Sequence, residues 1–196
     1  MNMKELWEES VKFHGHSCPG LAYGVRASVI AMERLNIKRS QDEEIVAIVE
    51  NDACGVDAVQ VIIGCSLGKG NLIIRNYGKQ VFIFIKRGYD KALRVYIKPL
   101  PRNDEERELR KKVMERVATE EERERFNKIR QDRIDYLLNA KEEDIADIRW
   151  INIEEPQRAR IFNSIQCEMC GEFFMETKGR IQDGKIVCME CFSYKD

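Results

Sequence analysis

Hydrophobic positions in the first hundred residues follow two different periods. Residues 3–12 and 21–35 repeat apolar side chains every three or four positions, which predicts two helices. Residues 44–50 form a short apolar run typical of a buried strand, and residues 56–63 return to helical spacing. The chain therefore begins as a mixture of helices and strands.

Three further segments are rich in β-branched and aromatic residues: 72–77, 81–86 and 93–98. Glycine-containing turns separate them, so we expect the three strands to form an antiparallel meander beside the strand at 44–50. Helices and strands in this arrangement predict an α+β fold with a mixed sheet flanked by helices.

Residues 103–138 are helical by their local signals. Asn103 with Glu106, and Thr119 with Glu122, have the spacing of capping boxes, which predicts two helices with a break near Thr119. Because Pro99 and Pro101 cannot continue a central strand, they mark the start of this region.

The apolar stripe on these helices is narrow. A helix that is polar over most of its surface needs a partner surface, in the same chain or in a second copy. We expect a homodimer in which the helical and C-terminal regions contact the neighbouring protomer. The stripe consists of Val113, Val117, Phe126, Ile129, Arg133, Tyr136, Leu137 and Leu138.

The balance of charges argues against two classes of partner, nucleic acid and anionic membranes. The sequence has 33 Lys and Arg against 34 Asp and Glu, a net charge of −1, which provides no general attraction to nucleic acid or anionic membranes. The arginines at 123, 125, 130 and 133 alternate with acidic residues, so a solvated helix face is favoured over a nucleic-acid patch. No apolar run has the ~20 residues that span a bilayer, and the first residues lack a signal-peptide pattern, so we expect a cytoplasmic protein.

Four of the seven cysteines form two Cys-x-x-Cys pairs near the C-terminus. Cys167 pairs with Cys170, and Cys188 pairs with Cys191. Two such pairs separated by a short hairpin complete a tetrahedral sulfur shell around zinc. This pattern predicts a small zinc-finger domain at 161–196, after an α+β core at 1–100 and a charged helical region at 101–160.

The other three cysteines lie close to predicted helix ends. Cys18 precedes Pro19 at the start of a helix, where the helix dipole favours a thiolate. We expect Asp52 to cap the helix whose first turn contains Cys54, and Cys65 lies just past that helix. His16 is two residues from Cys18 in an extended segment, so both side chains can face the same way.

These residues predict a pocket in which His16, Cys18, Cys54 and Cys65 bind a metal ion or act as redox thiols. For any one cysteine alone, simple packing in the core is the favoured interpretation. Both histidines of the chain and several glycines occur beside these cysteines, which reverses that preference. We expect Asp57 and Lys69 at the pocket rim, and His14 as a more remote or substrate-contacting residue.

Three ordered motifs resemble the FmdE family, named after a component of formylmethanofuran dehydrogenase. They are FHGHSCPG at 13–20, NDACGVDA at 51–58 and GCSLGKGN at 64–71. The C-terminal CEMCGE at 167–172 is similar to the zinc-finger tail that some members carry. The resemblance implies a thioredoxin-like core, an anaerobic setting and a link to one-carbon metabolism in methanogens. It does not imply the hydride chemistry of that dehydrogenase, which belongs to its other components.

The leading hypothesis is a metal-binding protein whose Cys/His pocket serves redox or metal-centre chemistry, alone or as part of a larger dehydrogenase. In that pocket Cys18, His16, Cys54, Asp57 and Lys69 would carry the chemistry. The rival hypothesis is a regulatory or adaptor module whose zinc finger binds protein or nucleic acid. The acidic balance of the tail argues against DNA.

Overall fold

The computed structural model describes residues 2–194 of the chain. Its contacts divide the chain into two compact units, Met1–Arg158 and Ala159–Asp196, and the charged helices belong to the first unit. Within the described residues, no helix is both long and apolar enough to cross a membrane.

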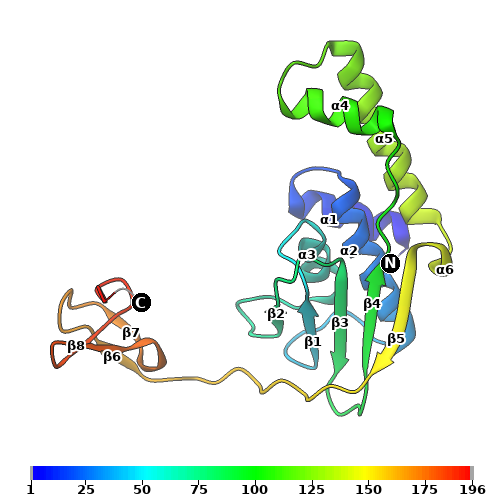
Figure 1. Ribbon diagram of the computed structural model, residues 1–196. Coiled ribbons are helices and arrows are strands. Elements are labelled where there is room, and N and C mark those ends of the chain that lie inside the picture. Colours follow the sequence, from blue (N-terminus) through cyan, green and yellow to red (C-terminus); the bar gives the residue numbers. More distant parts are fainter. Residues whose placement is uncertain (1, 195–196) are drawn as a thin grey trace. The chain divides into compact units, whose positions relative to one another are not determined.

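The first unit is built around a five-stranded mixed sheet with the strand order β2-β1-β3-β4-β5 (Figure 1). β1 and β2 are parallel, and all other neighbours are antiparallel. The strands are β1 (Ile45–Val49), β2 (Leu72–Ile74), β3 (Val81–Lys86), β4 (Ala92–Ile97) and β5 (Ala146–Ile151).

The predicted meander is wrong in one place, and one strand was missed. β2 does not pair with β3; it lies on the other side of β1, with Ala47 opposite Leu72. The chain after β2 instead bonds back to β1, since Tyr77 N–H donates to the carbonyl of Glu50. β5 escaped prediction because its polar residues Asp147 and Arg149 lie in the highly charged region, as suits an edge strand.

Helices cover one face of this sheet. They are α1 (Met3–His14), α2 (Pro19–Leu35), α3 (Gly55–Ala58) and the π-helical turn η1 (Val59–Ile63) that continues α3. Leu21, Ile30, Phe82 and Phe84 are fully buried between the helices and the strands, which makes this side the main core. The opposite face carries a smaller apolar cluster centred on Ile48.

Asp52 does not cap α3. Cys54 itself occupies the N-cap position and its side chain makes no capping bond. The preceding turn is held by Asn51, whose side-chain oxygen accepts a hydrogen bond from Ala53 N–H at 3.1 Å. An asparagine side chain two residues before the amide forms this turn locally, so Asp52 stays exposed.

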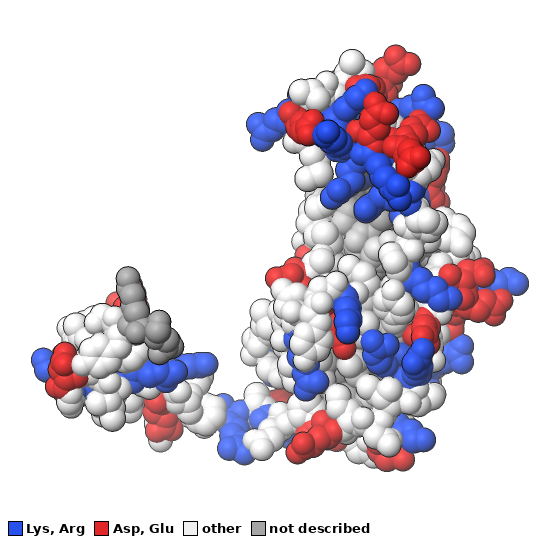
Figure 2. Space-filling model, viewed as in Figure 1, with Lys and Arg blue, Asp and Glu red and all other residues white. Residues whose placement is uncertain are grey.

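A helical arm projects beyond the sheet (Figure 1). It consists of α4 (Asp104–Met114) and α5 (Glu120–Asn139), and the short α6 (Glu142–Ile145) follows. The predicted break is confirmed, because Thr119 caps α5 in a complete capping box with Glu122. Basic and acidic side chains alternate over the arm (Figure 2).

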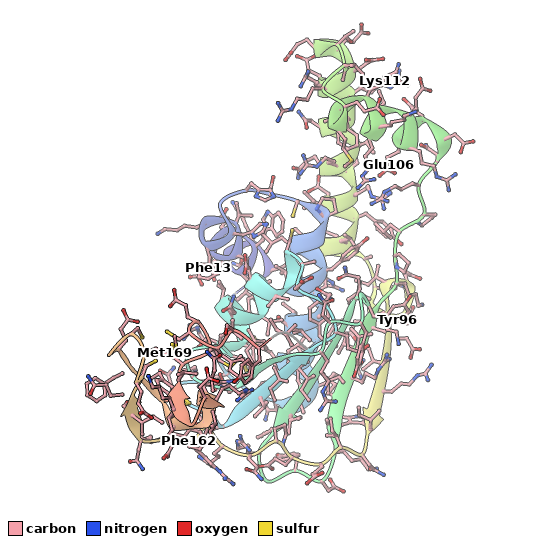
Figure 3. The ribbon with its side chains drawn as sticks, turned by 60° about the vertical axis from the view of Figure 1, so that its left-hand side comes forward. Phe13, Tyr96, Glu106, Lys112, Phe162 and Met169 are labelled. Atoms are coloured by element: carbon pink, nitrogen blue, oxygen red, sulfur yellow. The ribbon has the colours of Figure 1, made fainter. Side chains whose placement is uncertain are left out.

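The arm packs on its own chain through the C-terminal end of the predicted stripe, where Ile134 joins the predicted Leu137. Ile134 and Leu137 of α5 are fully buried, whereas Val117 is 65% exposed. Arg26 of α2 fastens the end of α5, because its Nη2 donates to the carbonyl of Ala140 at 2.7 Å. On α4, Glu106 pairs with Arg133 and Lys112 with Glu122, which joins the two helices of the arm (Figure 3).

The second unit is formed from two short hairpins. Its elements are β6 (Ser164–Gln166), β7 (Phe173–Met175), the 3-10 turn η2 (Glu176–Lys178), β8 (Arg180–Gln182) and β9 (Lys185–Val187). β6 pairs with β7, and β8 pairs with β9. Among the described residues of this unit, the fully buried apolar side chains are Cys167 and Val187, so hydrophobic burial alone provides little stability.

Candidate metal centres

A sharp turn between α1 and α2 brings both histidines beside Cys18. His14 is the last residue of α1, and Gly15 ends the helix in the left-handed conformation, with φ of 88°. The chain bends at Gly15 and His16 and then reaches Cys18, the N-cap of α2, whose backbone is extended. The Cys18 sulfur accepts a hydrogen bond from Leu21 N–H at 3.3 Å, so this side chain caps the helix.

His14, His16 and Cys18 converge on one point. One ring nitrogen of each histidine and the Cys18 sulfur all lie within 4.8 Å of one another. Cys18 Sγ is 3.8 Å from His14 Nε2, close to the roughly 3.6 Å expected between N and S ligands of one tetrahedral zinc. The two imidazole rings lie with centroids 4.3 Å apart. Three ligand atoms are therefore placed for one ion.

Asp57 of α3 sets the orientation of His14. Its Oδ2 lies 2.7 Å from His14 Nδ1, and its Oδ1 accepts a hydrogen bond from Gln60 at 3.2 Å. A carboxylate oxygen accepts hydrogen bonds, so Nδ1 is the nitrogen that donates to Asp57 and Nε2 is the nitrogen that faces Cys18. This is the carboxylate–histidine arrangement that supports metal-bound imidazoles in proteins.

Close contact between α2 and α3 brings Cys54 to the same place. A Cβ atom at Gly24 would lie 2.0 Å from the carbonyl oxygen of Gly55, so the two helix backbones touch. A Cβ at Gly20 would meet Cys54 Sγ at 3.5 Å and Cys18 Sγ at 3.8 Å, which places both sulfurs around this glycine. Burial, together with the adjacent Cys18, raises the pKa of the Cys54 thiol.

This arrangement suits two kinds of chemistry. Two imidazoles and one thiolate leave a tetrahedral ion with an open position, as in catalytic zinc sites. The neighbouring Cys54 lies outside this group of three ligand atoms but adds a second thiol beside Cys18, as a redox thiol pair requires. Of the residues predicted for the pocket, the structure brings together His16, Cys18, Cys54 and Asp57.

Cys65 and Lys69 do not belong to this cluster. Cys65 is fully buried and donates to the carbonyl of Ile45 at the start of β1, whereas Cys54 follows the end of that strand. Burial raises the pKa of Cys65 to about 12, so it is an inert packed thiol. Lys69 Nζ donates to the carbonyls of Ser40, Gln41 and Asp42, so it closes a loop instead of lining the pocket rim.

His14 was underestimated from the sequence. It was expected as a more remote or substrate-contacting residue in a turn after a helix at 3–12, but α1 extends to His14 and Gly15 reverses the chain directly after it. The useful signal was the glycine itself: a glycine at a helix C-terminus folds the next residues back over the last turn.

The four C-terminal sulfurs form the second cluster. The Sγ atoms of Cys167, Cys170, Cys188 and Cys191 all lie within 4.8 Å of one another. Cys170 and Cys188 are 4.0 Å apart, near the roughly 3.8 Å expected between two sulfurs of a tetrahedral zinc site. Gly171, with φ of 76°, allows the turn that aims the first pair inward.

The electrostatics of this cluster fit a divalent cation. Backbone N–H groups of Cys170 and Cys188 lower the pKa of Cys167 to about 6, whereas its neighbours Cys170 and Cys188 raise the pKa of Cys191 to about 12. Cys167 therefore loses its proton readily, whereas the neighbouring cysteines oppose ionisation of Cys191. Four thiolates can coexist at this place only around a positive ion.

An apolar cavity lies elsewhere, between α1, α2 and η1. It encloses about 500 Å³ and includes Leu6, Met32 and Ile62 in its lining. No residue of either cysteine cluster lines this cavity.

Comparisons with known proteins agree with the division of the chain into a larger N-terminal unit and a small C-terminal unit. Residues 13–147 match the family described as "FmdE, Molybdenum formylmethanofuran dehydrogenase operon", and residues 160–196 match the "Prokaryotic dksA/traR C4-type zinc finger". The predicted resemblance, the α+β class with a mixed sheet, and the C-terminal zinc-finger region are thereby confirmed.

Two individual proteins show the extent of the similarity. The chain is 37% identical over 189 residues to a "Probable S-adenosyl-L-methionine-binding protein" of Archaeoglobus fulgidus, which covers 92% of this chain but 50% of that protein. The chain thus spans about half the length of this curated relative. The crystal structure of an FmdE-like protein of the tungsten formylmethanofuran dehydrogenase type, from Syntrophus aciditrophicus, has the same fold. Its TM-score is 0.65, with 21% identity over 97% of this chain and 92% of that one.

Proposed function

The chain belongs to the FmdE family, and on this premise we propose that it uses a metal ion at His14, His16 and Cys18 for metal-centre chemistry in anaerobic one-carbon metabolism. The observation that carries the proposal is the convergence of three ligand atoms with Asp57 on the outer nitrogen of His14. A purely packed histidine needs neither feature. Asp57 holds the imidazole in the tautomer that a metal requires.

The donor set favours zinc or a similar divalent ion. Imidazole and thiolate together suit Zn²⁺, and three protein ligands leave one position for a water or a substrate. At that position a metal ion polarises a bound oxygen or lowers the pKa of water. Zinc at the four C-terminal thiolates has a structural role instead, since all of its positions are filled.

The one-carbon assignment rests on the relatives. The family description refers to the formylmethanofuran dehydrogenase operon, and the A. fulgidus relative is described as binding S-adenosyl-L-methionine. We infer an accessory or partner protein of such a dehydrogenase, working in the cytoplasm. A redox role is the alternative within this proposal, because the sulfurs of Cys18 and Cys54 both lie close to the position that a Cβ atom at Gly20 would take.

Metal analysis of anaerobically purified protein tests the proposal. We expect two metal ions per chain in the wild type, one in Cys18→Ser and one in Cys170→Ser. Cys65→Ser is the matched control and should keep both ions, because that thiol lies apart from the two clusters. A single ion per wild-type chain, with no loss in Cys18→Ser, would contradict the N-terminal site.

We also propose a homodimer, because the arm carries exposed apolar side chains near its tip. Met114 is 66% exposed and Val117 is 65% exposed, next to the turn between α4 and α5. A second copy would cover them. Light scattering at micromolar concentration should give twice the 22.9 kDa of one chain; the monomer mass would refute the dimer.

A second candidate function is protein binding through the zinc finger. Phe173 is 70% exposed and Ile181 is 72% exposed on this small unit, which is more apolar surface than a solvated module needs. Replacing both by Ser should abolish partner binding in this interpretation and leave the metal content at two ions per chain.

A further inference from the structure

Arg130 of α5 is held beside the N-terminal metal cluster. Its Nη2 donates to the carbonyl oxygen of Ser17 at 3.3 Å, and Ser17 is the residue between His16 and Cys18. The Phe126 ring supports the guanidinium, with its centroid 6.0 Å from the central carbon. One side chain of the arm thus reaches the loop that carries two of the three ligands.

The charge of Arg130 has no carboxylate partner in the part of the chain that the structure describes. The structure gives it no ion pair within residues 2–194, whereas Arg125 pairs with Glu105, and Arg133 with Glu106. Helix geometry explains this, because the positions three and four residues away on α5 hold Phe126, Asn127, Arg133 and Ile134, none of them acidic. Most of its five N–H donors therefore remain free for a ligand.

We propose that Arg130 recognises the anionic group of a small carboxylate that binds at the open position of the metal ion. This inference rests on the proposed function, since it requires an ion at His14, His16 and Cys18. A carboxylate has two oxygens, so one can bind the metal while the other accepts from the planar guanidinium. Lysine offers a point charge without this fork.

The surroundings of the open position favour an anion. An ion of charge +2 with one thiolate keeps a net charge of +1, and Asp57 is occupied by His14 and Gln60. Arg130 therefore adds positive charge to a site that is already not negative.

Acetate binding to the cobalt-loaded full chain tests the inference. Cobalt(II) gives visible absorption at both metal sites, and subtracting the spectrum of Cys18→Ser isolates the N-terminal one. Acetate should shift these bands in the wild type. Arg130→Gln should weaken acetate binding about tenfold, because it removes a charge-assisted hydrogen bond. Arg130→Lys should fall between the two.

Arg125→Gln is the matched control, since Arg125 lies on the same helix but pairs with Glu105 of α4; its acetate affinity should equal that of the wild type. Equal affinity in Arg130→Gln and wild type, with two cobalt ions bound to each, would overturn the role of Arg130 alone. Uptake of one cobalt ion per wild-type chain would overturn the metal proposal and this inference with it.

Discussion

The contact between α2 and α3 can be tested with a single methyl group. In Gly24→Ala the new Cβ would lie 2.0 Å from the carbonyl oxygen and 2.5 Å from the Cα of Gly55. Carbon and oxygen normally approach to about 3.3 Å, so the helices must separate by roughly 1.3 Å. α3 cannot retreat easily, because Gly55 also faces the buried Phe82.

The expected loss of stability follows from this overlap. Forcing a methyl group into a packed contact costs about 3 kcal/mol at the upper end of the usual range. Alanine gains roughly 1 kcal/mol over glycine inside a helix, which leaves a net loss of about 2 kcal/mol. With a urea slope of about 2 kcal/mol per molar, the unfolding midpoint should fall by about 1 M.

Tryptophan fluorescence during urea unfolding is the assay. Both tryptophans, Trp7 and Trp150, lie in the first unit, so the signal reports the core and not the zinc finger. Gly20→Ala is the control, because its Cβ would make ordinary contacts of 3.4–3.8 Å with Cys54 and Cys18. An unchanged midpoint in Gly24→Ala, or an equal loss in both variants, would refute the reasoning.

Three further predictions concern the metal sites and the isolated thiol. Cys170→Ser should unfold the second unit, so that proteolysis removes the tail, and leave the tryptophan signal of the first unit unchanged. The reason is that a metal site contributes on the order of 10 kcal/mol, whereas only Cys167 and Val187 are fully buried apolar side chains among that unit's described residues. Asp57→Asn should weaken metal binding at His14 about tenfold or more in a chelator competition, while the C-terminal site keeps its affinity. The pKa of Cys65 is raised to about 12, so its thiolate fraction at pH 8 is roughly a thousandth of that of an ordinary cysteine. Iodoacetamide should therefore leave Cys65 unmodified until the core unfolds. Labelling of the native protein at the rate of a free thiol would contradict this burial.

The sequence pattern was sufficient to predict the elements whose structure depends on residues close together in the chain. β3 occupies residues 81–86 as expected, and Thr119 caps α5, because a run of β-branched and aromatic residues and a capping box are local signals. Strand pairing is not local. β2 precedes β3 in the chain, yet it pairs with the opposite side of β1. The helical segment between β1 and β2 carries the chain back to the end of the sheet where β1 starts, so β2 runs parallel to β1 as an edge strand.

The C-terminal cluster could be predicted in full for a similar reason. Each Cys-x-x-Cys pair needs only its own tight turn, and a short hairpin brings the two pairs together. The N-terminal cluster draws on three separate elements: the end of α1, the start of α2 and the start of α3. Its composition depends on how these elements pack, and the sequence contained that information mainly in Gly24 and Gly55.

The fate of Cys65 shows why spacing alone was insufficient. Cys54 and Cys65 flank one helical segment, α3 with η1, and a segment of about ten residues is roughly 15 Å long. This segment runs antiparallel to β1, so one cysteine must lie at each end of the strand: Cys65 bonds to Ile45 at its start, and Cys54 follows its end. Two cysteines at opposite ends of a helix cannot share one ion unless the helix bends. A thiol at the start of α3 therefore had to be paired with the start of α2, where the Gly24–Gly55 contact brings Cys18 and Cys54 together.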